Sequence, residues 1–134
     1  MTQEVLAGLP DALRGAQRVF DRTGGLHAAG LFSTAGELLC LRKDVGRHNA
    51  VDKLLGRMLL DDRLPLSSAI LMVSGRSSFE IAQKCLTARV PILCSVSAPS
   101  SLAVDVATEF NMTLIGFVRD QRFNVYAGGV RISS

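Results

Sequence analysis

The sequence predicts an α/β fold, a three-layer α/β/α sandwich on a mixed β-sheet. Apolar residues make up 48% of the 134 residues and charged residues 20%, which is typical of one packed globular domain. Residues 68–74 and 92–96 are apolar through their middles, as in strands that are covered on both faces. Segments with helical periodicity alternate with these runs, so the later strands are predicted to be parallel and joined by right-handed crossovers.

The N-terminal part predicts one helix and one β-hairpin. Pro10 is expected to open the helix, because proline is favoured in a first turn, and the glycines at 24–25 end it. The apolar face of this helix is formed at helical spacing by Leu9, Leu13, Ala16 and Phe20. Residues 26–33 predict an alanine-rich strand against which another element packs closely. After a turn at 34–36, residues 37–42 predict the returning strand, so this antiparallel pair is expected at an edge of the sheet.

Two helices and a strand are predicted in the middle of the chain. Residues 47–60 form an amphipathic helix whose apolar face consists of Val51, Leu54, Leu55, Met58 and Leu59. The buried strand at 68–74 follows. Ser77 and Glu80 then match a capping box, with Ser77 as the N-cap residue of a helix that runs to about Arg89.

The C-terminal part predicts one more helix and the last strands. After strand 92–96, a helix is expected over residues 101–110, with Asn111 as its C-terminal cap. Its apolar face is formed by Leu102, Val106 and Phe110. The segments after it are predicted as a strand, a polar loop and a short edge strand, at 113–118, 119–122 and 123–126. We therefore divide the chain into an N-terminal helix, an α/β domain and a loosely ordered tail, at residues 1–22, 23–126 and 127–134.

The composition narrows the classes of protein. A net charge of +3 and a pI near 9.1 favour phosphate ligands, while the few aromatic residues disfavour nucleic acid as a partner. The longest apolar runs are far too short to span a bilayer and residues 1–4 do not resemble a signal peptide, so we expect a cytoplasmic protein without a membrane partner. Apolar segments hold the three cysteines, Cys40, Cys85 and Cys94, and no Cys-x-x-Cys motif occurs. This pattern predicts buried, inert thiols and no zinc.

Three polar segments each follow an apolar run and open a predicted helix, at residues 43–49, 74–80 and 95–101. In an open α/β sheet such loops line one crevice, where helix N-termini direct free N–H groups at a ligand. Gly75 permits close approach of the backbone, and Arg76 can donate two hydrogen bonds to phosphate oxygens. Further positively charged side chains come from Arg47, Arg119 and Arg122. The pattern predicts an anionic ligand, although neither a Walker A motif nor a full Rossmann fingerprint occurs.

Two alternatives to ligand binding stay open on residue patterns alone. A zinc-dependent nucleotide deaminase is disfavoured, because His48 is followed by Asn49 and Ala50 where the deaminase motif needs a glutamate. A hydrolase or nucleotide-modifying enzyme that uses His48 and Asp44 is the first alternative. A module that binds RNA or a partner protein through the basic stripe of its first helix is the second, and this stripe consists of Arg14, Arg18 and Arg22.

Five segments together resemble one known family, at residues 23–29, 43–53, 74–80, 97–105 and 116–126. They include the strings Thr-Gly-Gly-Leu-His, Lys-Asp-Val-Gly-Arg-His-Asn and Ser-Gly-Arg-Ser-Ser-Phe-Glu. In this order they resemble the formate dehydrogenase accessory sulfurtransferases of the FdhD/NarQ type. The resemblance extends from Thr23 to Tyr126.

The resemblance implies a cytidine-deaminase-like fold without deaminase chemistry. Members of the family carry sulfur from a cysteine desulfurase to the molybdenum cofactor of formate dehydrogenase, in its bis-molybdopterin guanine dinucleotide form. GDP is then expected to act as a partial mimic, and a homodimer is expected. The family's cofactor-binding loop corresponds here to Phe117, Val118, Arg119, Asp120, Gln121 and Arg122. The helix-opening loops add to the expected site Arg47, His48, Asn49, Arg76 and Ser77.

One part of the family pattern does not occur in this chain. The sulfur-carrying cysteines of the family lie in a Cys-x-x-Cys loop upstream of the segment that matches residues 23–27, where this chain has no cysteine. Because a thiol is needed to carry sulfane sulfur, no catalytic residue is assigned. We expect a C-terminal cofactor-binding part, one half of a split protein, or a homologue without sulfur transfer. A nucleotide-binding or RNA- or protein-interaction module is the alternative function.

Overall fold

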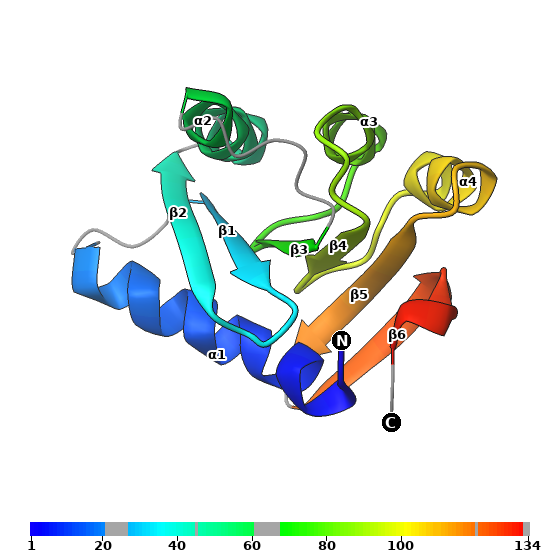
Figure 1. The fold of residues 1–134 in the computed structure, drawn as a ribbon, viewed down its shortest axis with the longest axis horizontal. Coiled ribbons are helices and arrows are strands. Elements are labelled where there is room, and N and C mark those ends of the chain that lie inside the picture. The colour runs from blue at the N-terminus through cyan, green and yellow to red at the C-terminus, as the bar shows by residue number, and fades with distance from the viewer. Residues whose placement is uncertain (21–26, 45, 61–67, 120, 133–134) are drawn as a thin grey trace.

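The computed structural model describes residues 1–20, 27–44, 46–60, 68–119 and 121–132 (Figure 1). A six-stranded sheet lies at its centre, in the order β2-β1-β3-β4-β5-β6. The strands are β1 (His27–Ser33), β2 (Leu38–Asp44), β3 (Ala69–Val73), β4 (Ile92–Ser95), β5 (Thr113–Arg119) and β6 (Arg122–Ala127). The helices are α1 (Gln3–Phe20), α2 (Arg47–Leu60), α3 (Phe79–Thr87) and α4 (Ser101–Glu109), followed by a 3-10 helix, η1 (Gly129–Arg131).

The three predicted layers are confirmed. Helix α1 covers one face of the sheet, and α2, α3 and α4 cover the other (Figure 1). Each face has its own apolar core, one formed with the leucines of α1 and the other with the inner sides of α2–α4. The cytidine-deaminase-like character of the fold stays a prediction. Among the described helices, none is long and apolar enough to cross a membrane.

Strand directions bring the polar loops to one edge of the sheet. Strand β1 is antiparallel to both β2 and β3, while β3, β4 and β5 are parallel to one another. The C-terminal ends of β2, β3, β4 and β5 therefore lie together, with the starts of β1 and β6 beside them. We call this side the loop edge; it comprises the strand ends there and residues 46, 74–78, 96–100 and 121. The sequence prediction that these loops share one edge is confirmed.

The predicted β-hairpin is confirmed, and an element does pack closely against it. Strands β1 and β2 pair around a turn in which Gly36 has a φ of +90°. A Cβ atom on Gly30 of β1 would lie 2.8 Å from Cδ1 of Leu13, so α1 lies directly on this strand. The bare backbone of Gly30 thus sets how near α1 approaches the sheet.

Helix α1 begins earlier than expected, because the prediction that Pro10 opens it is wrong. The helix starts at Gln3, and the Thr2 hydroxyl accepts a hydrogen bond from the Val5 N–H (3.2 Å). Leu6, which precedes Pro10, is fully buried in the core beneath α1. Burial of such side chains outweighs the one backbone hydrogen bond that a proline removes inside a helix.

The apolar face predicted for the fourth helix packs against the core only through Val106. Leu102 and Phe110 are each 59% exposed, whereas Ala103 and Ala107 are fully buried. Helix α4 packs against α3, and the small alanine side chains permit that close contact. Asn111 follows the helix with a φ of +60°, as expected of a C-terminal capping position.

The C-terminal tail is more ordered than the predicted loose segment. Strand β6 continues to Ala127 and η1 follows it. The Arg131 guanidinium donates to the Asn111 carbonyl (2.8 Å) and to the Thr113 hydroxyl (3.1 Å), and the Met1 amino group donates to the Arg131 carbonyl (3.1 Å). These bonds fix the described part of the tail, which ends at residue 132, against β5 and α1.

Candidate ligand site at the loop edge

The loop before α2 is organised by Asp44. Its carboxylate lies 2.5 Å from the Lys53 ammonium and accepts a hydrogen bond from the Gly46 N–H (3.1 Å). The hydrogen bond from Lys53, followed by that from Gly46, holds the pKa of Asp44 below its ordinary value of 3.8. The ionised carboxylate of Asp44 therefore stabilises the folded chain above pH 3.8. This stabilisation is lost as the pH falls through the lowered pKa of Asp44. It serves here as a structural carboxylate.

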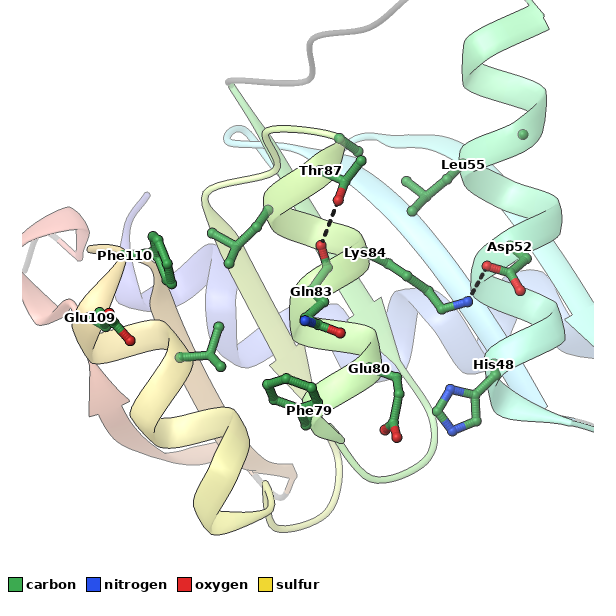
Figure 2. A pocket seen from close by; sticks show the side chains of 14 residues that line it. His48, Asp52, Leu55, Phe79, Glu80, Gln83, Lys84, Thr87, Glu109 and Phe110 are labelled. Atoms are coloured by element: carbon green, nitrogen blue, oxygen red, sulfur yellow. Dashed lines mark hydrogen bonds and ion pairs between the residues drawn. The ribbon is translucent and has the colours of Figure 1, made fainter.

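The Asp44–His48 pair of the hydrolase alternative is not supported by these contacts. Asp44 interacts with Lys53, Gly46 and Asn49. The imidazole of His48 instead lines a groove between α2 and α3, on the outer side of the helices (Figure 2). Among the described residues, no three His, Cys, Asp or Glu side chains converge as metal ligands.

The loop before α3 is tied to β1 by two hydrogen bonds. The Ala28 N–H donates to the Ser74 hydroxyl (2.9 Å), and the Ser74 N–H donates to the Ala28 carbonyl (3.0 Å). This pairing fixes the start of the loop and leaves the side chain of Arg76 exposed beside it. Arg76 thus lies at the loop edge, as predicted.

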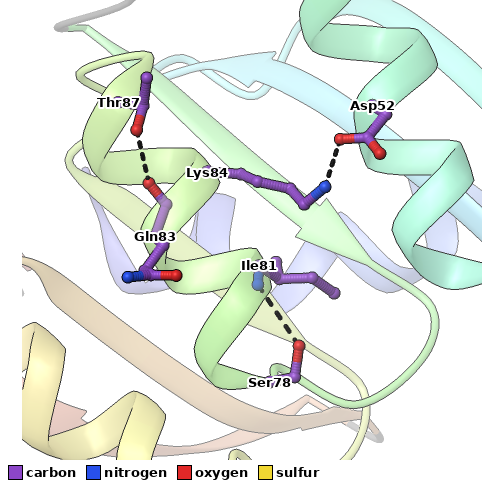
Figure 3. A network of polar contacts seen from close by, with 6 residues as sticks. All are labelled: Asp52, Ser78, Ile81, Gln83, Lys84 and Thr87. Atoms are coloured by element: carbon purple, nitrogen blue, oxygen red, sulfur yellow. Dashed lines mark hydrogen bonds and ion pairs between the residues drawn. The ribbon is translucent and has the colours of Figure 1, made fainter.

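The N-cap of α3 is Ser78, so the prediction of Ser77 at this position is wrong by one residue. The Ser78 hydroxyl accepts from the Ile81 N–H (3.3 Å) (Figure 3). The neighbouring Ser77 hydroxyl is fully buried and has no hydrogen-bond partner among the residues that the structure describes, while the Ser77 carbonyl accepts from the Ser100 N–H (2.9 Å). A capping box does not distinguish two consecutive serines, because either can reach a helix N–H.

The loop before α4 packs directly on β5. The Phe117 N–H donates to the Ser97 carbonyl (3.2 Å), and the Ser95 hydroxyl donates to the same carbonyl (2.7 Å). A Cβ atom on Gly116 would lie 2.9 Å from Cδ of Pro99 and 3.0 Å from the Ser97 oxygen. Only glycine at this position permits the loop to approach the strand so closely. Neighbouring loops are thereby bonded to one another along the loop edge.

The β5–β6 hairpin carries an irregular backbone where the candidate ligand residues lie. Its register shifts between Gly116 and Arg119, and Phe117 has a φ of +53°. A left-handed conformation at a bulky residue costs about 1–3 kcal/mol, and such strain is concentrated at functional sites. Bulges also redirect side chains next to binding sites.

A pocket of about 490 Å³ lies on this hairpin. It is lined by Phe117, Arg119, Arg122, Phe123 and Asn124. The guanidinium of Arg119 lies over the ring of Phe117, 5.4 Å from its centroid, which is within the range of a cation–π contact. Two cationic groups and two aromatic rings therefore surround one small cavity at the loop edge.

Comparison with known proteins identifies the family. The model of the FdhD/NarQ family matches residues 1–133. The chain belongs to this family. It is 62% identical to a sulfur carrier protein FdhD of Streptomyces coelicolor over 133 residues, which are 99% of this chain and 47% of that protein. It is 54% identical over 134 residues to a sulfur carrier protein FdhD of Nocardia farcinica, covering 100% of this chain and 48% of that protein.

The fold agrees with this membership. The structure is similar to the crystal structure of a putative formate dehydrogenase accessory protein from Desulfotalea psychrophila, with a TM-score of 0.88 and 31% sequence identity. That match covers 99% of this chain and 56% of the other. This FdhD/NarQ chain therefore spans about half the length of the curated relatives it matches.

The residues predicted to form the ligand site do not all lie together in the structure. Phe117, Arg119 and Arg122 line the hairpin pocket, with Gln121 exposed in the turn beside it. The side chain of Val118 is fully buried in the core under α1, so this residue offers a ligand only its backbone. Asn49 is exposed at the start of α2. Asp120 and the side chain of Arg47 lie outside the part of the chain that the structure describes.

Two pocket residues, Phe123 and Asn124, were not among the predicted site residues. The signal for them was present, since both fall within the segment that resembles the family. The predicted loop ended at Arg122, where β6 begins in the structure. Arg122 at the start of β6 pairs with Arg119 at the end of β5, so the first residues of β6 share the pocket.

The cysteines of this FdhD/NarQ chain are buried, as predicted. Cys40, Cys85 and Cys94 all have free thiols inside the apolar cores. Burial raises the pKa of Cys85 to about 12 and also raises the pKa of Cys94. A thiol must be exposed and deprotonated to exchange sulfur, so Cys85 and Cys94 are suited to packing.

Proposed function

We propose that this chain binds the guanine dinucleotide part of the molybdenum cofactor, which is the cargo of an FdhD-type sulfur carrier. The observation that carries the proposal is the hairpin pocket, where Arg119 and Arg122 accompany the rings of Phe117 and Phe123. Guanidinium groups bind phosphate oxygens with paired hydrogen bonds, and aromatic rings stack on a purine base. A guanine nucleotide presents both of these chemical groups.

The size and electrostatics of the loop edge support the same ligand. A cavity of about 490 Å³ falls within the usual range for small-molecule sites. Helices α2, α3 and α4 all begin at this edge, so their partial positive charges lie on the side where phosphates would bind. The exposed Arg76 adds a further cation there. A long, doubly charged dinucleotide can then extend from the hairpin pocket along these helix starts.

In this proposal the chain holds the cofactor and does not itself provide the sulfur-carrying thiol. The buried cysteines support that division of roles. The curated relatives are named sulfur carrier proteins, and the similar crystal structure is named a putative formate dehydrogenase accessory protein. We therefore propose a cysteine desulfurase as the sulfur donor, formate dehydrogenase as the recipient of the cofactor, and a homodimer as the working form.

The test is calorimetric titration of GDP into this chain, with ADP and inorganic phosphate as competing probes. We expect saturable GDP binding, weaker ADP binding, and a loss of roughly 10- to 100-fold in affinity for Arg119→Ala. The matched control is Arg14→Ala, an exposed arginine of α1 that does not line the hairpin pocket, which should leave the affinity unchanged.

Each outcome separates the candidate functions. Equal binding of GDP and ADP would favour a general nucleotide-binding module, the alternative derived from the sequence. Absence of GDP binding, or equal affinities of the Arg119→Ala variant and the unmodified chain, would contradict the proposed site.

A further inference from the structure

The residues that line the hairpin pocket differ in the hydrogen bonds that their side chains can form. Arg119 and Arg122 carry donors alone, and the rings of Phe117 and Phe123 carry no polar group. Asn124 has a carboxamide, which provides both an acceptor and donors. Among the described residues that line this pocket, Asn124 therefore carries the only side-chain acceptor.

The pairing of β5 with β6 places Asn124 beside the arginines. Gly116 lies opposite Asn124, and Arg119 lies opposite Arg122. Between these two pairs β5 advances three residues and β6 only two, so the extra residue belongs to β5 and β6 is regular here. Arg122 and Asn124 are thus alternate residues of a regular strand, which places their side chains on one face, about 7 Å apart.

The carboxamide of Asn124 is available to a ligand. Asn124 is exposed, and the residue opposite it on β5 is a glycine, which has no side chain to cover the carboxamide. No hydrogen bond joins this carboxamide to the residues that the structure describes. Phe123, which precedes it, packs partly buried against the core under α1 and so holds this part of β6 in place.

The two arginines indicate the end of the pocket at which phosphate binds. Like charges directly opposite each other in a sheet are destabilising, and Arg119 and Arg122 form such a pair. Among the described residues, no carboxylate forms an ion pair with either guanidinium. A diphosphate bound between them compensates both charges. The ribose and base of the same nucleotide can then extend along β6 toward Asn124.

A pocket dominated by donors favours guanine over adenine. Guanine presents O6 and N7 as acceptors, whereas adenine carries an amino donor in place of O6. Guanine also has an N1–H donor, which needs an acceptor from the protein, because an unpaired donor in a desolvated site costs binding free energy. The Asn124 carboxamide meets this need, since its Oδ1 can accept from N1–H while its Nδ2 donates to O6.

We propose that Asn124 is the residue that recognises the guanine base, while Arg119 and Arg122 hold the diphosphate. This inference rests on the proposed function and names the specificity-determining residue of that site. It assigns the two parts of the nucleotide to two ends of the pocket. Removal of the carboxamide is therefore expected to impair recognition of the base and to leave binding of the phosphates intact.

The experiment is calorimetric titration of the unmodified chain and of Asn124→Leu with GDP, IDP, ADP and inorganic diphosphate. Asn124→Leu removes the carboxamide but keeps a side chain of similar size. We expect it to weaken GDP binding about 10-fold and to leave diphosphate binding unchanged. IDP keeps O6 and N1–H, so it should bind the unmodified chain within about 3-fold of GDP, whereas ADP should bind more weakly.

Further variants make the assignment specific. Asn124→Asp offers acceptors alone, which suit the N1–H and 2-amino donors of guanine but not the N1 acceptor of adenine. It should therefore raise the ratio of GDP affinity to ADP affinity, although its negative charge weakens the binding of both. The matched control is Gln83→Leu, which removes an exposed carboxamide of α3 outside the hairpin pocket and should leave every affinity unchanged. Arg119→Ala should instead weaken GDP and diphosphate alike.

Several results would overturn this inference. They are equal GDP affinities of Asn124→Leu and the unmodified chain, equal losses of GDP and diphosphate binding in Asn124→Leu, IDP binding no tighter than ADP binding, or the same loss for Gln83→Leu. If Arg119→Ala still weakens GDP binding in those cases, the proposed function stands and only the role of Asn124 is wrong. Absence of GDP binding to the unmodified chain would contradict both.

Discussion

Helices α1 and α4 both carry apolar residues at helical spacing, but they use them in opposite ways. Leu6, Leu9 and Leu13 of α1 are at most 2% exposed, because they face the sheet. Leu102 and Phe110 of α4 face solvent, and α4 is anchored through its alanines. Apolar periodicity therefore shows that a helix has a face to cover, but not that the same chain covers it.

The difference follows from the surface against which each helix packs. Helix α1 lies across one face of the sheet, and large side chains are needed to exclude water there. Helix α4 lies beside α3 on the other face, where short side chains bring the backbones close. Leu102 and Phe110 are thus left on the outer side of α4, whereas Val104 and Val106 pack partly buried against the core.

The largest expected effect distinguishes the buried leucines of α1 from the exposed Leu102 of α4. Leu9→Ala should lower the free energy of unfolding by about 2–5 kcal/mol, because it leaves a cavity in the core under α1. The matched change Leu102→Ala should alter it by less than about 0.5 kcal/mol, since this side chain is largely in water. Urea denaturation measures both. Equal losses of unfolding free energy would show that Leu102 is also covered within the chain.

A second change tests the close packing of α4. Ala107→Leu places a large side chain on the buried side of the helix and should cost about 1–3 kcal/mol of unfolding free energy. Thr108→Leu, one position further along and exposed, is the control and should cost less than about 0.5 kcal/mol. If thermal unfolding shifts by the same amount in both variants, α4 does not depend on its alanines.

Helix caps provide a third contrast between the same helices. The Ser100 hydroxyl caps α4 by accepting from the Ala103 N–H (3.1 Å) in a partly buried loop, whereas Thr2 caps α1 at an exposed end. Ser100→Ala should cost about 1 kcal/mol and Thr2→Ala about half as much, because water can replace the exposed cap. Chemical denaturation of the two variants under one condition tests this order.

The smallest effect concerns the polar side of α1. Arg14 forms an ion pair with Asp11, and both side chains are more than half exposed. Arg14→Ala should therefore change the unfolding free energy by less than about 0.5 kcal/mol, and added salt should reduce that small difference further, because salt screens exposed charges. A larger loss would mean that α1 depends on its outer surface as well as on its leucines.

Local sequence patterns predicted the helices and strands well. Contacts between distant segments decided where α1 begins and which side of α4 is buried. The helix at Arg47–Leu60 was predicted with its observed bounds, because its apolar periodicity is regular and continuous. The start of α1 was misjudged because Pro10 is a local signal, whereas burial of Leu6 depends on a sheet formed much later in the chain. No local rule indicates which side of α4 faces the sheet.

The candidate ligand site was predicted only in part, because part of it also depends on how distant segments pair and pack. The arginines of the hairpin were found from the resemblance to the family, and the polar loops were found from their positions after apolar runs. The left-handed Phe117 and the register shift at Gly116–Arg119 leave no signature in the residue types. They arise from how the hairpin pairs and packs, and they help to form the pocket that Phe123 completes.

The packing of α1 has a consequence for how the chain folds. Leu6 shares its core with Ile115 of β5, and α1 also contacts β5 directly, so the first helix is covered by the fifth strand. On the ribosome, the leucines of α1 can pack on β1 and β3 first, but their core stays incomplete until β5 has emerged. Such distant pairing slows folding and lengthens the time during which apolar surface can aggregate. Folding of this domain is therefore completed only after β5 has been synthesised, when the core under α1 can close.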